Sequence, residues 1–436
     1  MAFAASIDWT FLELLFDQHG KIIAGALAFL VAIVSLFVAI YRYRHTNSIE
    51  RILGRGAQQV RKDQEFLRKG KAALRQAAEA LEQQKEKLLE RERKLDNVRI
   101  GFVGKEHELW CLHPARKPKE YDDRIWHQRR APIVTIANLK GGVGKTTLTA
   151  NLAAYFNKIG KRVLLIDVDY QGSLSNMMLS ADGVEQVPNG INSLITPGAN
   201  ADAFAHTAHK FTTILKSSAI VAARYELASL ENRLMVEYLL QEDEDDGRYR
   251  LANILLSEQV GKTFDIALID APPRLTAGTI NAFCASTHLL VPTVYDLLSA
   301  EAVGTFLAGA KVLQASLNPR IDLLGVVGML TSQQHQLAVR EENAKRTAVG
   351  QVAQTWSSTH HFFTRHIPRK AAIAAAAGES VAYHCDAIVS GWFDELGDEM
   401  CSRLGWQSPP QPNDTKHNGT GSRAARQSPS QREMIH

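Results

Sequence analysis

The feature that most constrains the fold of this chain is a glycine-rich loop between a predicted strand and a predicted helix. Residues 133–156 read IVTIANLKGGVGKTTLTANLAAYF: a short run rich in β-branched residues, then the loop, then an amphipathic stretch. β-Branched residues favour a strand, and glycines let the backbone close tightly around a ligand. Because the loop leads into a helix N-terminus, its N–H groups form a site for phosphate. The pattern therefore predicts a phosphate-binding loop within an α/β fold.

The side chains of this loop fit a nucleotide and a magnesium ion. Lys145 can reach the terminal phosphates, and Thr146 stands where such loops supply a hydroxyl to Mg²⁺. The whole loop is expected to contact the phosphates: Gly141, Gly142, Val143, Gly144, Lys145, Thr146 and Thr147.

The loop departs from the common pattern in one respect. The pattern GxxxxGK(S/T) places its first glycine at Leu139, whereas the run here is KGGVGKTT. This run resembles the deviant Walker A motif, KGGxGK(S/T), of the ParA/MinD family of P-loop ATPases. The resemblance implies that the nucleotide is ATP and that Lys140 reaches the nucleotide of a second subunit, where an added cation stabilises transition-state charge. Hydrolysis would then require a homodimer that forms on ATP binding.

Carboxylates end two further predicted strands. The segment VLLIDVDYQGSLS carries Asp167 and Asp169, and FDIALID ends in Asp270. Ligands of open α/β sheets bind outside the carboxyl ends of the strands, so these side chains are expected beside the phosphates. Both segments resemble family motifs. The resemblance implies that Asp169 positions the attacking water, acting with Lys140 and Lys145 as the catalytic set, and that Thr146, Asp167 and Asp270 surround Mg²⁺.

The last motif lies near the end of the chain. Residues 362–384, FFTRHIPRKAAIAAAAGESVAYH, resemble a family segment in which Pro368 and Arg369 would line the adenine pocket. The resemblance runs from about Ile133 to about Leu404. The expected fold class is therefore α/β: a P-loop NTPase with a mostly parallel central sheet flanked by helices, preceded by one transmembrane helix and a long helix.

An uncharged apolar run near the N-terminus predicts the transmembrane helix. Residues 22–40 read IIAGALAFLVAIVSLFVAI, which as a helix would cover a hydrocarbon core of about 30 Å. Acidic residues precede this run and arginines follow it, so the arginine side is expected to face the cytoplasm. We therefore predict a short segment 1–21, a single-pass helix 22–41 in contact with the lipid bilayer of the bacterial inner membrane, and an ATPase domain in the cytoplasm. A cleaved signal peptide and a buried core helix are the alternatives.

Residues 48–99 contain no proline and favour a long helix. Apolar residues recur in it every seven positions, the period of a coiled coil: Leu53, Val60, Leu67, Leu74, Leu81, Leu88 and Leu95. The second seam is filled only in places, so a single solvated helix is the alternative to a dimeric coiled coil. The remaining predicted segments are a connector at 100–131, the ATPase domain at 132–405 and a disordered tail at 406–436. The sequence leaves the role of the connector open.

The partner is less well defined than the nucleotide. The net charge of +4 argues neither for nor against nucleic acid. Partitioning members of the family bind DNA through an arginine a few residues after the last motif, where this chain reads KAAIA from Lys370. DNA is therefore the less favoured partner, although Arg340, Lys345 and Arg346 are alternative cations.

The predicted function is a Mg²⁺-dependent ATPase that acts as a dimerisation switch and positions, partitions or recruits a partner complex. Slow turnover, stimulated by a protein activator or cargo, is expected. One alternative is an enzyme related to bacterial tyrosine kinases, which the tail disfavours because it contains no tyrosine after Gln407. The other is a nucleotide-locked membrane scaffold in a secretion, conjugation or defence system.

Overall fold

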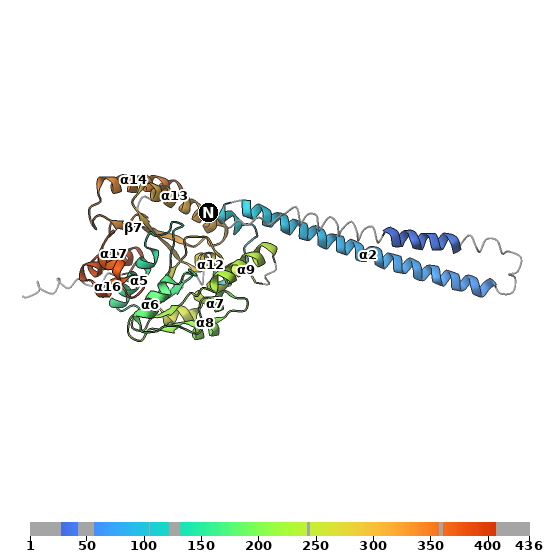
Figure 1. Cartoon of the computed structure of the whole chain (residues 1–436), viewed down its shortest axis with the longest axis horizontal. Coiled ribbons are helices and arrows are strands. Elements are labelled where there is room, and N and C mark those ends of the chain that lie inside the picture. The colour runs from blue at the N-terminus through green and yellow to red at the C-terminus, as the bar shows by residue number, and fades with distance from the viewer. Residues whose placement is uncertain are drawn as a thin grey trace, which may run out of the picture. The chain divides into compact units, whose positions relative to one another are not determined.

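The computed structural model describes residues 28–41, 56–103, 105–121, 131–241, 245–356 and 361–406. The chain divides into two compact units, Met1–Glu90 and Arg91–His436. Figure 1 shows the helices and strands in chain order.

The N-terminal unit consists, in its described part, of helix. Residues 28–41 are helical, and α2 (Gly56–Val103) begins in this unit. The predicted long helix 48–99 therefore corresponds to α2, with residues 48–55 outside the described part. The side chain of Tyr41 bonds to Asp63, so the short helix lies against α2.

The predicted transmembrane helix and inner-membrane location are contradicted. Among the residues that the structure describes, no helix is both long enough and apolar enough to cross a bilayer. Of the predicted span 22–41, the structure describes residues 28–41. Residues 1–27 and 407–436 lie outside the described part, and with them the predicted N-terminal segment and nearly all of the predicted tail.

One twisted sheet forms the centre of the Arg91–His436 unit. Its strands, within the described residues, lie in the order β3-β4-β2-β5-β1-β6-β7-β8. Neighbouring strands are parallel except for the pair of β3 and β4. The strands are β1 (Ile133–Ile136), β2 (Val163–Asp167), β3 (His209–Lys210), β4 (Ala219–Val221), β5 (Ile266–Asp270), β6 (His288–Val294), β7 (Asp322–Thr331) and β8 (Ile367–Pro368). The mostly parallel sheet confirms the predicted α/β class.

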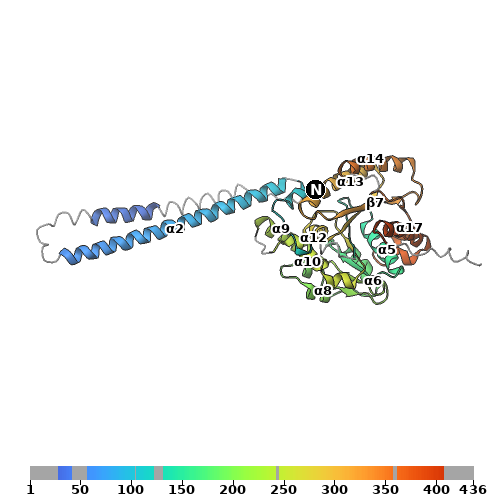
Figure 2. The same ribbon diagram turned by 180° about the vertical axis from the view of Figure 1, so that it is seen from behind.

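Alternation along the strands divides the core into two layers. In β2, Leu164 and Ile166 face one hydrophobic cluster, and Val163 and Leu165 face the other. Successive side chains of a strand point to opposite faces, so a strand buried on both faces must be apolar throughout. Figures 1 and 2 show helices on both sides of the sheet. Each buried aliphatic side chain contributes about 1.5–3 kcal/mol.

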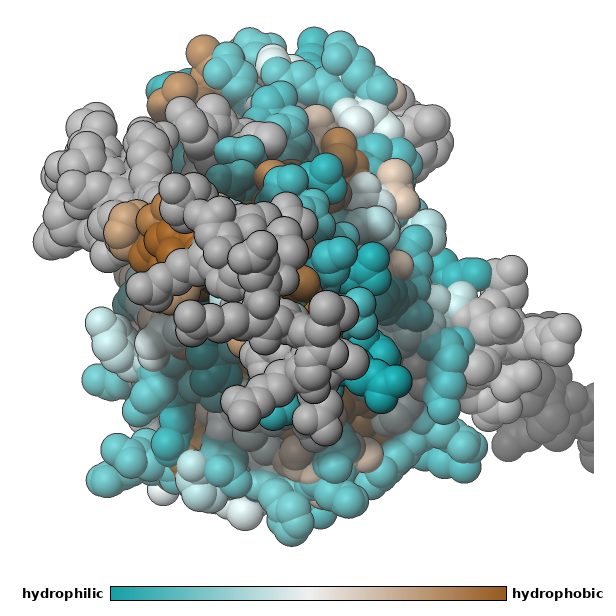
Figure 3. Space-filling model, turned by 90° about the vertical axis from the view of Figure 1, so that its right-hand side faces the viewer, coloured by the Kyte–Doolittle hydropathy of each residue, from teal (hydrophilic) through white to brown (hydrophobic). Residues whose placement is uncertain are grey.

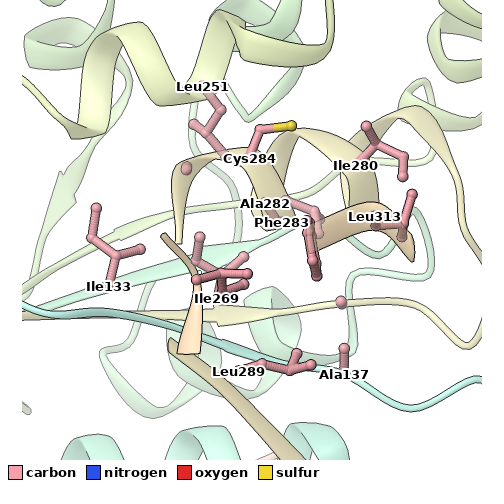
Figure 4. Packing of buried hydrophobic residues seen from close by; sticks show 14 of the residues in the cluster. Ile133, Ala137, Leu251, Ile269, Ile280, Ala282, Phe283, Cys284, Leu289 and Leu313 are labelled. Carbon is pink, nitrogen blue, oxygen red and sulfur yellow. The ribbon is translucent and has the colours of Figure 1, made fainter. Parts of the chain in front are cut away.

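The first cluster packs the sheet against α9 (Leu227–Leu240), α10 (Arg250–Leu255), α12 (Ala277–Ala285) and α13 (Leu297–Ser316). Figure 4 shows strand residues Ile133, Ile269 and Leu289 packed with Ile280 and Phe283 of α12. The second cluster packs the other face against α5 (Lys145–Lys158), α6 (Ser173–Ala181) and α17 (Ala387–Arg403). On the face drawn in Figure 3, hydrophilic residues cover most of the described surface, as expected when the apolar residues are gathered in these clusters.

Shorter elements complete the unit. They are α3 (Glu106–Leu109), α7 (Asn192–Ile195), α8 (Ala201–Thr207), α11 (Glu258–Thr263), α14 (Val339–Thr355), α15 (Ala371–Ala376), α16 (Ala382–Cys385) and the 3-10 helices η2 (Lys119–Tyr121) and η3 (Gly247–Tyr249).

Candidate nucleotide-binding site

The predicted phosphate loop connects β1 to α5 at the carboxyl end of the sheet. Gly144 precedes the first residue of α5 with a φ of +87°, and Gly142 has a φ of +70°. Both angles favour glycine. A Cβ atom at Gly144 would also lie 3.0 Å from the Cε atom of Met329 on β7. The glycines therefore let the chain turn into α5, whose N-terminus suits an anion.

Lys145 begins α5 and is 8% exposed. Its Nζ atom donates to the Lys140 carbonyl at 3.2 Å. Burial lowers the pKa of Lys145, while the negative charges of Asp270 and Asp169 act in the opposite direction. The cation is therefore held among carboxylates at the start of the helix, where phosphate oxygens would meet it.

Two buried carboxylates lie at the carboxyl ends of adjacent strands. Asp167 ends β2 and Asp270 ends β5, and the two residues are in register on adjacent parallel strands. The hydroxyl of Thr146 donates to Asp270 Oδ2 at 2.7 Å. Burial, followed by the negative charge of Asp167, raises the pKa of Asp270 well above its usual value. A divalent cation would relieve this charge repulsion, so the residues present fit Mg²⁺.

Asp167 differs from Asp270 in its partners. Its Oδ2 atom accepts from the Ser175 backbone N–H at 2.9 Å and from the Ser175 hydroxyl at 2.8 Å. Its Oδ1 atom accepts from the Asp169 N–H at 3.0 Å. Asp167 therefore fixes the turn between β2 and α6 through both of its oxygens.

That turn presents Asp169. The Oδ1 atom of Asp169 accepts from the Gln171 N–H at 3.0 Å, and its carbonyl accepts from the Gly172 N–H at 2.8 Å. The side chain is only partly buried. Beside the turn lies a cleft of about 380 Å³, whose lining includes Tyr170 and Tyr225. Asp169 is thus held in a defined position at an accessible edge of the site.

Lys140 is bound within its own chain. Its Nζ atom donates to Ser299 Oγ at 2.5 Å and lies 3.4 Å from both carboxylate oxygens of Asp296. Asp296 also caps α13 by accepting from the Ser299 N–H at 2.7 Å. Although burial opposes it, these bonds from Ser299 and the charge of Lys140 lower the pKa of Asp296. The sequence prediction did not include Asp296 or Ser299, although an aspartate just before the first residue of a helix is a capping signal.

Pro368 and Arg369 lie at the edge of the sheet. Pro368 is in β8 beside β7, and the Arg369 N–H donates to the Thr331 carbonyl at 2.9 Å. Met329, on the same strand β7, packs under Gly144. The structure thus places these residues on the carboxyl side of the sheet, near the strand that supports the loop, and their contact with adenine stays a prediction.

Known proteins are similar to this chain in sequence and in fold. A family model described as an AAA domain matches residues 131–323. The chromosome-partitioning ATPase Soj of Thermus thermophilus is 31% identical over 274 residues, covering 62% of this chain and 96% of the relative. The sporulation initiation inhibitor protein Soj of Bacillus subtilis is 32% identical over 209 residues, covering 48% of this chain and 76% of the relative.

A structure of a Cyanothece McdA variant in complex with ATP has the same fold. Its TM-score is 0.53 at 18% identity, and the match covers 65% of this chain and all of that one. At this identity the likeness concerns the fold alone.

Proposed function

Because the chain belongs to the ParA/MinD family of P-loop ATPases, we propose that it binds ATP with Mg²⁺ and uses ATP to switch from monomer to homodimer. In the dimer it would position or partition a partner complex, and release would follow hydrolysis. The Thermus thermophilus relative is named a chromosome-partitioning ATPase, which supports this class of function.

The described site supports nucleotide binding. The turn from Gly141 to Thr147 leads into α5, and Lys145 lies at its start. Thr146 and Asp270, already in contact, would hold Mg²⁺, which when bound would neutralise charge on the terminal phosphates. Asp167 would contribute indirectly, because its Oδ1 atom accepts from the Asp169 N–H and so fixes the turn that carries Asp169. Asp169 would then orient the attacking water.

The position of Lys140 is the observation that carries the switch. Its ammonium group is held by Asp296 and Ser299 of its own chain, whereas Lys145 lies among the carboxylates of the site. We propose that Lys140 leaves Asp296 to reach the γ-phosphate of a second subunit. A cation supplied in trans would stabilise transition-state charge only after the subunits close. Hydrolysis would then be coupled to dimerisation.

Sedimentation velocity of the full chain with ADP and with a non-hydrolysable ATP analogue tests this proposal. The analogue should shift the wild type toward the dimer, and Lys140→Ala should remain unshifted. Lys158→Ala is the matched control, because Lys158 lies on the same helix α5 and pairs with Asp394 at 2.7 Å, away from the phosphate loop. An equal analogue-induced shift in Lys140→Ala would contradict the role of Lys140 in trans.

A further inference from the structure

Residues 105–121, here named the strap, pack onto the nucleotide-binding unit. They precede the segment that the family model matches, which begins at residue 131. Leu109, Trp110 and Tyr121 are at most 8% exposed and belong to the hydrophobic cluster formed with α9, α10 and α12. The strap is therefore an integral part of this unit, although the sequence pattern left the role of the connector open.

A buried ion pair fixes the middle of the strap. Arg248, 2% exposed, lies 2.7 Å from Asp246. The guanidinium also donates to the carbonyls of Trp110 at 2.8 Å and Pro114 at 3.0 Å. In return, Asp246 accepts from the Arg116 backbone N–H at 3.0 Å. A buried guanidinium requires acceptors for its N–H groups, so these bonds hold the strap in one position.

The strap holds the loop that follows Asp270. Leu275 lies in this loop, between β5 and α12, and its carbonyl accepts from Trp110 Nε1 at 2.8 Å. The Leu275 N–H donates to Glu106 Oε2 at 3.4 Å. The Trp110 ring also stacks on Tyr238 of α9, with the ring centroids 5.2 Å apart and an interplanar angle of 29°. Both backbone polar groups of Leu275 are thus bound by the strap.

The loop is short and stiff between its two attachments. At one end Asp270 is bound to Thr146, and at the other Leu275 is bound to Trp110. Pro272 and Pro273 lie between them. Proline fixes φ and restricts the residue before it, so Leu275 cannot move far without moving the backbone near Asp270.

We propose that Trp110 is a positioning residue for ATP hydrolysis: through Leu275 it sets the loop behind Asp270 in the geometry that hydrolysis requires. This inference rests on the proposed ATPase activity at the same site. Trp110 does not touch the phosphates, so losing its bond should slow the chemical step and leave ATP binding almost unchanged.

Steady-state ATP hydrolysis by the full-length Trp110→Phe variant tests the proposal. Phenylalanine keeps a buried ring against Tyr238 but cannot donate to Leu275. The expected result is a kcat reduced about three- to tenfold, the effect of losing one hydrogen bond, with the KM for ATP within about twofold of wild type. Trp356→Phe is the matched control, because Trp356 is 4% exposed and its indole N–H donates to the Leu307 carbonyl at 3.1 Å, away from this loop.

The affinity for a non-hydrolysable ATP analogue supplies a second readout. It should stay within about twofold of wild type in both Trp110→Phe and Trp356→Phe, because neither side chain touches the phosphates. An unchanged kcat in Trp110→Phe, or an equal fall in Trp356→Phe, would overturn the positioning role. A wild-type chain that does not hydrolyse ATP would instead overturn the proposed function.

Discussion

At the residue scale, the site contains two buried carboxylates whose charged forms are destabilised by burial. Asp167 and Asp270 are at most 2% exposed and lie in register on neighbouring strands. Asp167 has three donors within 3.0 Å, whereas Asp270 depends chiefly on the Thr146 hydroxyl. Without a bound cation, the negative charge of Asp270 is therefore compensated by fewer hydrogen bonds than that of Asp167. Keeping this charge buried lowers the free energy of unfolding of the protein.

Replacing Asp270 by asparagine should stabilise the metal-free and nucleotide-free protein. Burial and the charge of Asp167 raise the pKa of Asp270, so its ionisation lowers the free energy of unfolding as pH rises from its usual pKa toward the raised value. The asparagine side chain is uncharged and keeps an oxygen for Thr146. We expect the free energy of unfolding of Asp270→Asn to exceed that of wild type by about 1–3 kcal/mol at neutral pH, while ATP turnover is lost.

Urea unfolding between pH 5 and pH 8 measures this difference. The difference should shrink as pH falls, because the wild-type carboxyl then takes up a proton. Asp265→Asn is the opposite control: hydrogen bonds from Arg162 lower the pKa of Asp265, so neutralising it should reduce stability at neutral pH. A less stable Asp270→Asn at neutral pH would show that the wild-type carboxylate is well compensated.

At the element scale, α2 presents an apolar stripe with the seven-residue period of a coiled coil. Its described members are 41–54% exposed in the single chain: Val60, Leu67, Leu74, Leu81 and Leu88. An identical helix placed alongside would bury such a stripe, since seven-residue spacing keeps one face toward a partner along the whole length. We therefore expect α2 to pair with α2 of a second copy within the ATP-dependent dimer.

Substituting glutamine for Leu74 and Leu81 should weaken this pairing. The two changes remove apolar area from the stripe but retain good helix formers, so helix content should be unchanged. Sedimentation equilibrium with the non-hydrolysable ATP analogue should show a dissociation constant at least about tenfold higher than wild type. The matched control replaces Phe66 and Leu89, which are 71% and 50% exposed and lie one position off the stripe. Equal weakening by both pairs would argue against a specific seam.

At the scale of the whole molecule, the choice between DNA and another partner depends on cations near the last motif and on α14, three of which are engaged within the chain. Lys370, the cation that follows the Ile367–Arg369 motif, lies 3.5 Å from Asp386 and 5.7 Å from the centre of the Trp392 ring. Of the alternative cations on α14, Arg346 pairs with Glu342 at 3.5 Å, and Lys345 is half-buried over Tyr295. Nonspecific affinity for DNA depends on lysines and arginines that can displace counterions, and these contacts compete with that role.

We therefore expect weak binding to duplex DNA in the presence of ATP and Mg²⁺. At physiological salt, the dissociation constant should be about 10⁻⁴ M, the weak end of nonspecific binding. Fluorescence anisotropy of a labelled duplex across a salt series measures both the affinity and the number of phosphates neutralised. Micromolar affinity with a steep dependence on salt would make DNA a partner and would favour partitioning over positioning of a protein complex.

The sequence by itself determined the phosphate loop and the carboxylates at the strand ends, because these features depend on neighbouring residues and on where each strand ends. The run from β1 through the glycines into α5 is local, and the positive φ angles at Gly142 and Gly144 follow from residue type. Asp167 and Asp270 could be placed together because parallel strands bring their carboxyl ends to one edge of the sheet. The residue chemistry alone predicted only that a nucleotide binds. The family motifs added the expectation that this nucleotide is ATP.

Only the tertiary structure decided which distant groups meet. Lys140 and Ser299 are 159 positions apart, and Trp110 and Leu275 are 165 positions apart. No periodicity or spacing encodes such pairs, because they depend on how helices pack on the sheet. The inner-membrane prediction was wrong as well: an apolar run in the sequence indicated a spanning helix, whereas no helix in the described part of the chain is both long enough and apolar enough to cross a bilayer.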